Sequence, residues 1–380
     1  LLLALASCGQ QKAVNGQSKV PAKAQKLFNQ GYDAFQYGEY AQAEELFLQA
    51  IKKHPSFVDA WDALARTYQV QGQKQQAISA YRRVLVHDAR HVFALYELGS
   101  LYFDMEGLDS SEYFYQFFLR EAGNTDKYTA VAERRLSNIA FTRRVIANPS
   151  NIQAVNLGSG VNSRLEEYSP ALTIDGQTIF FTSRDGSMPY QRQNEDIYWA
   201  EKIQGEWQQS KPIGPPINTV ENEGAFSVSA DGRYIFYTAC NRSGGLGQCD
   251  IWLTMQEGSS WSEPLNLGRP INSKAWESQP SISSDGRFLY FTSNRKGGYG
   301  GTDLYVSVFT DSGWSEPRNL GSEINTAKDE QFPFIHPDGS TLYFSSMGHP
   351  GMGGSDLYVS QLKPDGSWTK PNNLGYPINS

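Results

Sequence analysis

Four glutamates stand at regular intervals in the second half of the chain, and their carboxylates are its clearest candidates for chemistry. They are Glu167, Glu223, Glu277 and Glu330. If each comes just before the innermost strand of a radial β array, the four form a ring near one mouth of a central channel and could bind a cation or a cationic ligand. Alternatively, the carboxylates are structural and accept backbone N–H bonds from a neighbouring repeat. We favour the structural interpretation, because buried carboxylates are usually hydrogen-bonded parts of the framework.

Motifs of enzyme chemistry are missing from the sequence. His87 and His91 are four residues apart near the end of an expected helix, but no glutamate follows His87 as the general base of a zinc protease would. The nucleophile elbow G-x-S-x-G, the P-loop and a dinucleotide-binding G-x-G-x-x-G between a strand and a helix are absent as well. We therefore predict no catalytic residue, no metal site and no cofactor, and expect that the chain is not an enzyme.

The chain has three cysteines, for which we expect two different roles. Cys240 and Cys249 are nine residues apart, at the end of one expected strand and the start of the next. The two positions should face each other across a hairpin, within disulfide range. We predict a disulfide, which contributes about 2.5–3 kcal/mol at most by closing so short a loop.

The remaining cysteine, Cys8, follows an apolar remnant at Leu1–Leu5. The run Leu5-Ala6-Ser7-Cys8 fits a bacterial lipoprotein signal, in which the Cys thiol is acylated, and a polar linker follows it. We expect lipidation of Cys8 and a body tethered to a membrane by lipid in an oxidising compartment.

The elements that must position the glutamates form a repeat of 53 to 56 residues. Every copy contains an Asp-Gly turn, an aromatic strand that begins with Asp, and a later tryptophan. The tryptophans are Trp207, Trp261, Trp314 and Trp368. A long, fixed period of short aromatic strands and Gly-rich turns predicts a β-propeller with WD40-like blades of four strands. Within the third copy, we expect the Trp314 segment to be the fourth strand.

The phase of this repeat suggests an incomplete ring. Residues 156–158 match the end of a blade, and residues 373–380 match the start of another. We therefore expect residues 151–162 to be the outer strand of a ring-closing blade, and both ends of the chain to be truncated.

A second repeat, with a period of 34 residues, precedes the propeller. Ala43 and Ala77, Leu64 and Leu98, and several aromatic pairs are 34 residues apart. The pattern resembles the tetratricopeptide repeat, in which two helices form each unit, and residues 126–146 are expected to add a capping helix. The first helices should line a concave groove for a protein partner, with these residues in it: Phe28, Tyr32, Phe35, Arg66, Phe93, Tyr96 and Phe103. The open alternative is that some of them pack internally or against the propeller.

We therefore predict a multidomain protein, an α-solenoid followed by a β-propeller. Residues 1–21 are the signal remnant and linker, residues 22–148 the helical repeats and residues 149–380 the propeller. The formal net charge is −7, with +2 in residues 1–148 and −9 in residues 149–380. An acidic propeller argues against nucleic-acid binding and against attachment to anionic lipid by charge alone.

Together, the lipobox, the helical repeats and the motif N-x4-E-x7-D-G…FTSxR…GGxGG-x-DLY…W-x-x-P-x-NLG resemble Gram-negative outer-membrane lipoproteins of the OmpA family, some of which serve the type IX secretion system. The resemblance covers residues 1–380 and implies a lipid-anchored protein on the periplasmic side of the outer membrane. In that family a C-terminal domain binds peptidoglycan, but this sequence ends before such a domain, so no peptidoglycan contact can be assigned to its residues.

The function predicted from the sequence is a non-enzymatic periplasmic scaffold or adaptor that binds protein partners at the outer membrane, in secretion or in anchoring the cell envelope. One alternative is a periplasmic sensory propeller that binds a glycan or a peptide. Another is the regulatory propeller of a peptidase, which requires a hydrolase domain beyond Ser380.

Overall fold

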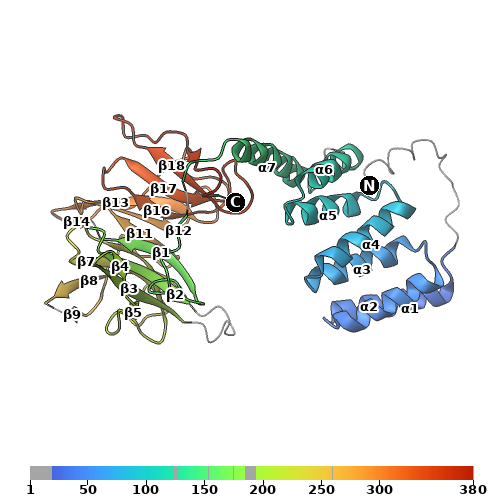
Figure 1. Ribbon diagram of the computed structural model, residues 1–380, viewed down its shortest axis with the longest axis horizontal. Helices are drawn as coiled ribbons and strands as arrows, with labels where there is room; N and C mark the ends of the chain where they lie inside the picture. The colour runs from blue at the N-terminus through green and yellow to red at the C-terminus, as the bar shows by residue number, and fades with distance from the viewer. Residues whose placement is uncertain are drawn as a thin grey trace. The chain divides into compact units, whose positions relative to one another are not determined.

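The computed structural model describes residues 19–123, 127–152, 154–173, 175–184, 194–258 and 260–379. The chain divides into two compact units, Leu1–Ile139 and Ala140–Ser380. The first unit is helical and the second is built mainly of β-strands (Figure 1).

The helical unit contains three antiparallel helix pairs and most of a seventh helix. The pairs are α1 (Ala22–Gln36) with α2 (Tyr40–Lys53), α3 (Val58–Val70) with α4 (Lys74–His87), and α5 (Val92–Phe103) with α6 (Leu108–Ala122). Helix α7 (Thr129–Ala147) lies in the range expected for a capping helix, and the boundary between the units falls within it. Asp126, the expected start of that helix, lies outside the described residues.

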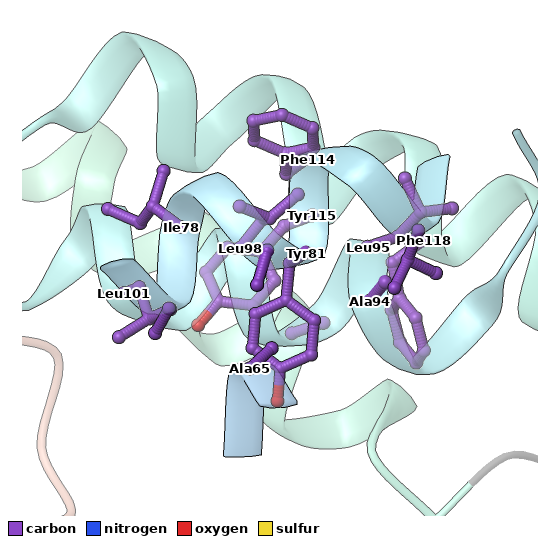
Figure 2. Packing of buried hydrophobic residues seen from close by; sticks show 14 of the residues in the cluster. Ala65, Ile78, Tyr81, Ala94, Leu95, Leu98, Leu101, Phe114, Tyr115 and Phe118 are labelled. Atoms are coloured by element: carbon purple, nitrogen blue, oxygen red, sulfur yellow. The ribbon is translucent and has the colours of Figure 1, made fainter. Parts of the chain in front are cut away.

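Close contact between the two helices of a pair explains the spacing of small and aromatic residues. A Cβ atom on Gly31 would lie 2.8 Å from the Phe47 ring, and one on Gly99 would lie 2.8 Å from the Tyr115 ring. Glycine therefore lets the aromatic ring of the second helix approach the backbone of the first. Figure 2 shows the result around Tyr115, where buried side chains from α3 to α6 share one core.

The β unit consists of four antiparallel sheets, arranged like a four-bladed propeller. Three long strands form most of each sheet. The first strands are β1 (Glu166–Leu172), β6 (Asn222–Val228), β11 (Glu277–Ile282) and β16 (Glu330–Ile335). The second strands are β2 (Thr178–Arg184), β7 (Tyr234–Cys240), β12 (Phe288–Ser293) and β17 (Thr341–Ser346). The third strands are β3 (Glu195–Ile203), β8 (Cys249–Glu257), β13 (Asp303–Thr310) and β18 (Asp356–Gln361). We call the sheets the first to fourth blades, in chain order.

Apolar cores lie between consecutive blades. Leu304 and Val306 of the third blade share a buried cluster with Leu342, Phe344 and Tyr358 of the fourth. The first strands of successive blades also contact one another, β6 with β11 and β11 with β16. The blades thus pack side by side in chain order, with their first strands innermost.

The fourth strand of a blade differs from the prediction, because it is split into short pieces. In the third blade, β14 (Gly313–Trp314) and β15 (Arg318–Asn319) both pair with β13. Between them, the Ser315 side chain accepts a hydrogen bond from the Val308 N–H at 3.0 Å, in place of a backbone carbonyl. The corresponding short strands of the other blades are β4 (Glu206–Trp207), β5 (Lys211–Pro212), β9 (Ser260–Trp261), β10 (Leu265–Asn266) and β19 (Asn372–Asn373).

The segment expected to be the outer strand of a closing blade, residues 151–162, forms no strand where it is described. Instead, Val161 is buried against Ile179 and Phe181 of the first blade, and the Gly160 carbonyl accepts a hydrogen bond from the Ser210 N–H at 2.8 Å. The segment covers the first blade without sheet pairing.

An asparagine before each later blade, buried before the third and fourth, fixes the preceding third strand. Asn272 is fully buried, and its side chain accepts the Ile251 N–H and donates to the Ile251 carbonyl, both at 2.8 Å. The amide thus replaces a neighbouring strand.

We expect Asn272→Ala to lower the free energy of unfolding of the β unit by about 2–4 kcal/mol, because each buried polar group left unpaired costs about 1–3 kcal/mol. Denaturant titration followed by tryptophan fluorescence measures this, since seven of the eight tryptophans lie in this unit. Asn162→Ala is the matched control, because the Asn162 amide bonds the Leu157 N–H at an exposed site. Equal effects of the two substitutions would contradict the assignment.

Candidate functional site

The four predicted glutamates are held by donors of the protein itself. Glu277 is fully buried and accepts hydrogen bonds from the Ser273 N–H at 2.8 Å, from the Ser273 hydroxyl at 2.8 Å and from the Ser293 hydroxyl at 2.9 Å. The Arg295 guanidinium lies 3.2 Å from the same carboxylate. This environment leaves little of the charge uncompensated, as expected for a structural carboxylate.

The same arrangement recurs in the other blades, except that the glutamate of the first blade is less buried. Glu223 and Glu330 are fully buried and bond the N–H and hydroxyl of Thr219 and Thr326. Burial raises the pKa of both carboxyl groups, against the lowering effect of these hydrogen bonds. Glu167 is only partly buried and bonds Ser163. Among the described residues, no three His, Cys, Asp or Glu side chains are grouped so that they could hold a metal ion.

The two cysteines of the second blade are joined by a disulfide in the structure. Cys240 ends β7 and Cys249 begins β8, where the two residues are register partners, and their Cα atoms are 3.9 Å apart. The bond closes the base of the loop at residues 241–248. Cys8, the predicted lipidation site, lies outside the described residues.

The predicted groove residues occupy the first helices of the pairs, α1, α3 and α5, and several of them pack inside. The Phe28 ring lies 5.1 Å from the Phe57 ring and belongs to the edge of a buried cluster. Phe35 packs edge-on against Tyr40, and Tyr96 stacks on Tyr128 with their centroids 4.4 Å apart. These three rings serve mainly the helical core.

Two of the other predicted residues, Tyr32 and Arg66, are more accessible. Tyr32 is 47% exposed, and the Arg66 side chain is 46% exposed. The Arg66 guanidinium lies 4.2 Å from the centre of the partly buried Phe93 ring, so α3 and α5 bring these two residues together. The Arg135 guanidinium lies 4.3 Å from the centre of the Phe103 ring. A charged group over an aromatic face is a common feature of protein-binding surfaces.

Three polar residues that the sequence reasoning missed surround the Arg66–Phe93 pair. Asp62 forms an ion pair with Arg66 at 2.8 Å. Gln69, one turn further along α3, donates to the Glu97 carboxylate of α5 at 2.8 Å and accepts from the Tyr81 hydroxyl at 2.5 Å. Residues 62, 66 and 69 follow helical spacing and therefore share one face of α3. We call Asp62, Arg66, Gln69, Phe93 and Glu97 the α3–α5 patch.

Burial raises the pKa of both acidic members of this patch. Desolvation raises the pKa of Asp62, and the Arg66 charge opposes this shift. Desolvation also raises the pKa of Glu97, against the hydrogen bond from Gln69. One oxygen of Asp62 is buried without a hydrogen-bond partner in the described structure. The patch therefore holds two desolvated carboxylates around one half-exposed cation.

The 34-residue period contained a signal for these residues. Position 62 corresponds to Phe28 and Tyr96, and position 69 corresponds to Phe35 and Phe103. The middle unit has polar residues at two positions that are aromatic in the units on either side. This difference indicates the patch. Glu97 follows Phe93 by one helical turn.

Comparison with known proteins identifies the helical repeats. Two family models of the tetratricopeptide repeat match, one over residues 46–79 and the other over residues 63–116. The chain therefore contains tetratricopeptide repeats, which mediate protein–protein interactions. No curated protein matches the chain.

Solved structures of tetratricopeptide-repeat proteins that are similar to this chain cover 32% to 39% of it. The Sgt2 tetratricopeptide domain of Aspergillus fumigatus is 20% identical and covers 39% of this chain and 97% of its own, with a TM-score of 0.32. The first such domain of Spaghetti (RPAP3), bound to an HSP90 peptide, is 20% identical, with coverages of 32% and 94% and a TM-score of 0.29. The Yersinia enterocolitica chaperone SycD, with a peptide of the translocator YopD, is 15% identical, with coverages of 33% and 99% and a TM-score of 0.31. These values carry no argument about partners.

Helices long and apolar enough to span a membrane are absent from the described residues.

The raised pKa of Glu97 predicts a pH-dependent effect of Glu97→Gln. A raised folded-state pKa means that the parent protein loses stability as the pH rises above the ordinary glutamate value of 4.5. The substituted amide keeps an acceptor for the Gln69 side chain but cannot ionise. We therefore expect the stability of the variant relative to the parent to increase between pH 4 and pH 7.5, measured by urea unfolding of the helical circular dichroism signal.

The exposed Glu133→Gln substitution is the matched control and should show a smaller pH trend. A relative stability of Glu97→Gln that falls with rising pH would contradict the assignment.

Proposed function

We propose that the protein is a non-enzymatic adaptor whose tetratricopeptide repeats hold a protein partner at the α3–α5 patch and the neighbouring Tyr32. The observation that carries the proposal is the patch itself, a half-exposed arginine on an aromatic ring with polar residues around it. Arginine and aromatic side chains are the usual anchors of protein interfaces.

The chemistry of the patch suggests the kind of segment that it holds. Asp62 and Glu97 are desolvated carboxylates with raised pKa values, so a basic side chain of the partner would stabilise their ionised forms. Phe93 within the patch, and Tyr32 at the position equivalent to Arg66 in the preceding repeat, supply apolar contact area. A partner segment with a basic residue next to an apolar residue fits this arrangement.

We further propose that this adaptor is a lipoprotein of the outer membrane on the periplasmic side, tethered through Cys8, and that it works in secretion or in anchoring the cell envelope. The lipobox and the resemblance to OmpA-family lipoproteins of the type IX secretion system support this proposal. The propeller supplies a second, separate surface.

Site-specific crosslinking tests the partner site. A photoreactive benzoylphenylalanine at Tyr32 should capture a discrete protein in cells, because the side chain borders the proposed interface. The capture should fall at least about tenfold when Arg66→Ala and Phe93→Ala are introduced together, since a few anchors dominate such interfaces.

Tyr113 is the matched control position. It is 46% exposed, against 47% for Tyr32, but lies on α6, a second helix of its pair. Equal capture from position 113, or capture from position 32 that survives the double substitution, would overturn the proposed site.

The anchor has a separate test. Cys8 should incorporate a fatty-acid analogue in cells, and Cys8→Ala should abolish labelling and release the protein from the membrane fraction. Labelling and membrane association that persist in Cys8→Ala protein would refute the lipoprotein proposal and leave the adaptor proposal standing.

A further inference from the structure

At one position of the propeller, the third blade has a different type of residue from the second and fourth blades. The residue just before the buried glutamate is Asn222 in the second blade and Asp329 in the fourth, but Trp276 in the third. Because these repeats share one fold, the polar residues show what the position does when it is structural.

In the second and fourth blades, the polar residue at this position forms hydrogen bonds with the preceding blade. The Asn222 side chain accepts a hydrogen bond from the Glu195 N–H of the first blade at 3.2 Å. Asp329 accepts from the Thr302 N–H of the third blade at 2.9 Å and from its hydroxyl at 3.1 Å. Glu195 and Thr302 both immediately precede the Asp near the start of their third strand.

The junction between the second and third blades is fastened differently. The residue equivalent to Glu195 and Thr302 is Cys249, which is tied by the disulfide to Cys240. The adjoining loop packs tightly on the third blade, because a Cβ atom on Gly247 would clash with the Ala275 carbonyl oxygen, just as one on Gly300 would clash with that of Lys328 at the next junction. The loop is therefore held in place without a hydrogen bond from the side chain at position 276, so this position can have a non-polar residue.

A surface hollow of about 460 Å³ lies at this junction. Its lining includes Gln248 from the disulfide-closed loop and Lys274, Trp276 and Lys296 from the third blade. This volume falls within the usual range of small-molecule sites. The hollow thus combines one partly exposed indole, two ammonium groups and a primary amide.

The two lysines have no acidic partner in the described part of the chain, although residues 149–380 carry a net charge of −9. Arg295, which also lines the hollow, is already paired with Glu277. At the position of Lys274, the second and fourth blades have Val220 and Ala327. The first blade has Arg164 at this position, so among the junctions between consecutive blades of this structure the positive charge occurs at this one.

We propose that this hollow binds an acidic saccharide, a sugar that carries a carboxylate. The apolar face of a pyranose ring packs on the indole of Trp276, the carboxylate lies between Lys274 and Lys296, and the Gln248 amide bonds ring hydroxyls. The acidic surroundings repel densely charged polyanions, so a ligand with isolated carboxylates is favoured over nucleic acid or polyphosphate.

Calorimetric titration of the full chain with trigalacturonic acid tests the proposal, with maltotriose as the uncharged match and triglutamate as the acidic peptide match. Only trigalacturonic acid should bind measurably. Trp276→Asn and Lys274→Ala should each weaken it at least about tenfold, the loss typical of an anchor residue. Lys370→Ala, an exposed lysine elsewhere in the propeller, should not change binding.

We expect the substituted proteins to fold. In Trp276→Asn, the new side chain is the one found at the equivalent position of the second blade, and it can accept a hydrogen bond from the Cys249 N–H. Their unfolding midpoints should match that of the parent. Absence of binding, equal binding of maltotriose, equal binding of triglutamate, or unchanged affinity in Trp276→Asn would each overturn the assignment. None of these results bears on the partner site of the helical repeats.

Discussion

A single repeat of this chain cannot bury its own apolar face, and both units follow from that constraint. Leu304 is fully buried because the fourth blade covers it, whereas Leu357, at the same position of the fourth blade, is 41% exposed. In the helices, Phe47 of α2 shares a buried cluster with Leu64 of α3, in the next pair. Stability therefore resides in the junctions between repeats, where a buried polar group such as Asn272 must find partners because unpaired ones are costly.

The repeats themselves could be predicted from the sequence, because junction residues must recur at the period of the fold. The spacing of 34 residues indicated the helix pairs, and the Asp-Gly turns with the later tryptophans indicated the blades. The split of the fourth strand could not be predicted, because it depends on the Ser315 side chain taking the place of a backbone carbonyl. Phe28 packs on Phe57, the alternative that the sequence left open, since periodicity identifies a face of a helix and not what covers it.

Departures from the repeat identify candidate sites better than the repeated residues do. Positions shared by all copies, such as the buried glutamates, are occupied by the framework's own hydrogen bonds. Asp62 stands where the adjacent repeats have Phe28 and Tyr96, and Trp276 stands where the next blade has Asp329. At both places a different contact stabilises the fold, the ion pair with Arg66 in one case and the disulfide in the other. Trp276 is thereby available for binding, whereas Asp62 is itself buried and holds the more exposed Arg66 in place.

Hydrogen–deuterium exchange on the full chain is the most direct test of the central claim, that the helical unit binds the protein partner. The measurement compares the chain alone with its complex with the protein captured from position 32. The account predicts added protection in residues 58–70 and 92–103, which form α3 and α5, and unchanged exchange in the blades. Protection confined to residues 166–373, with none in α3 or α5, would contradict it.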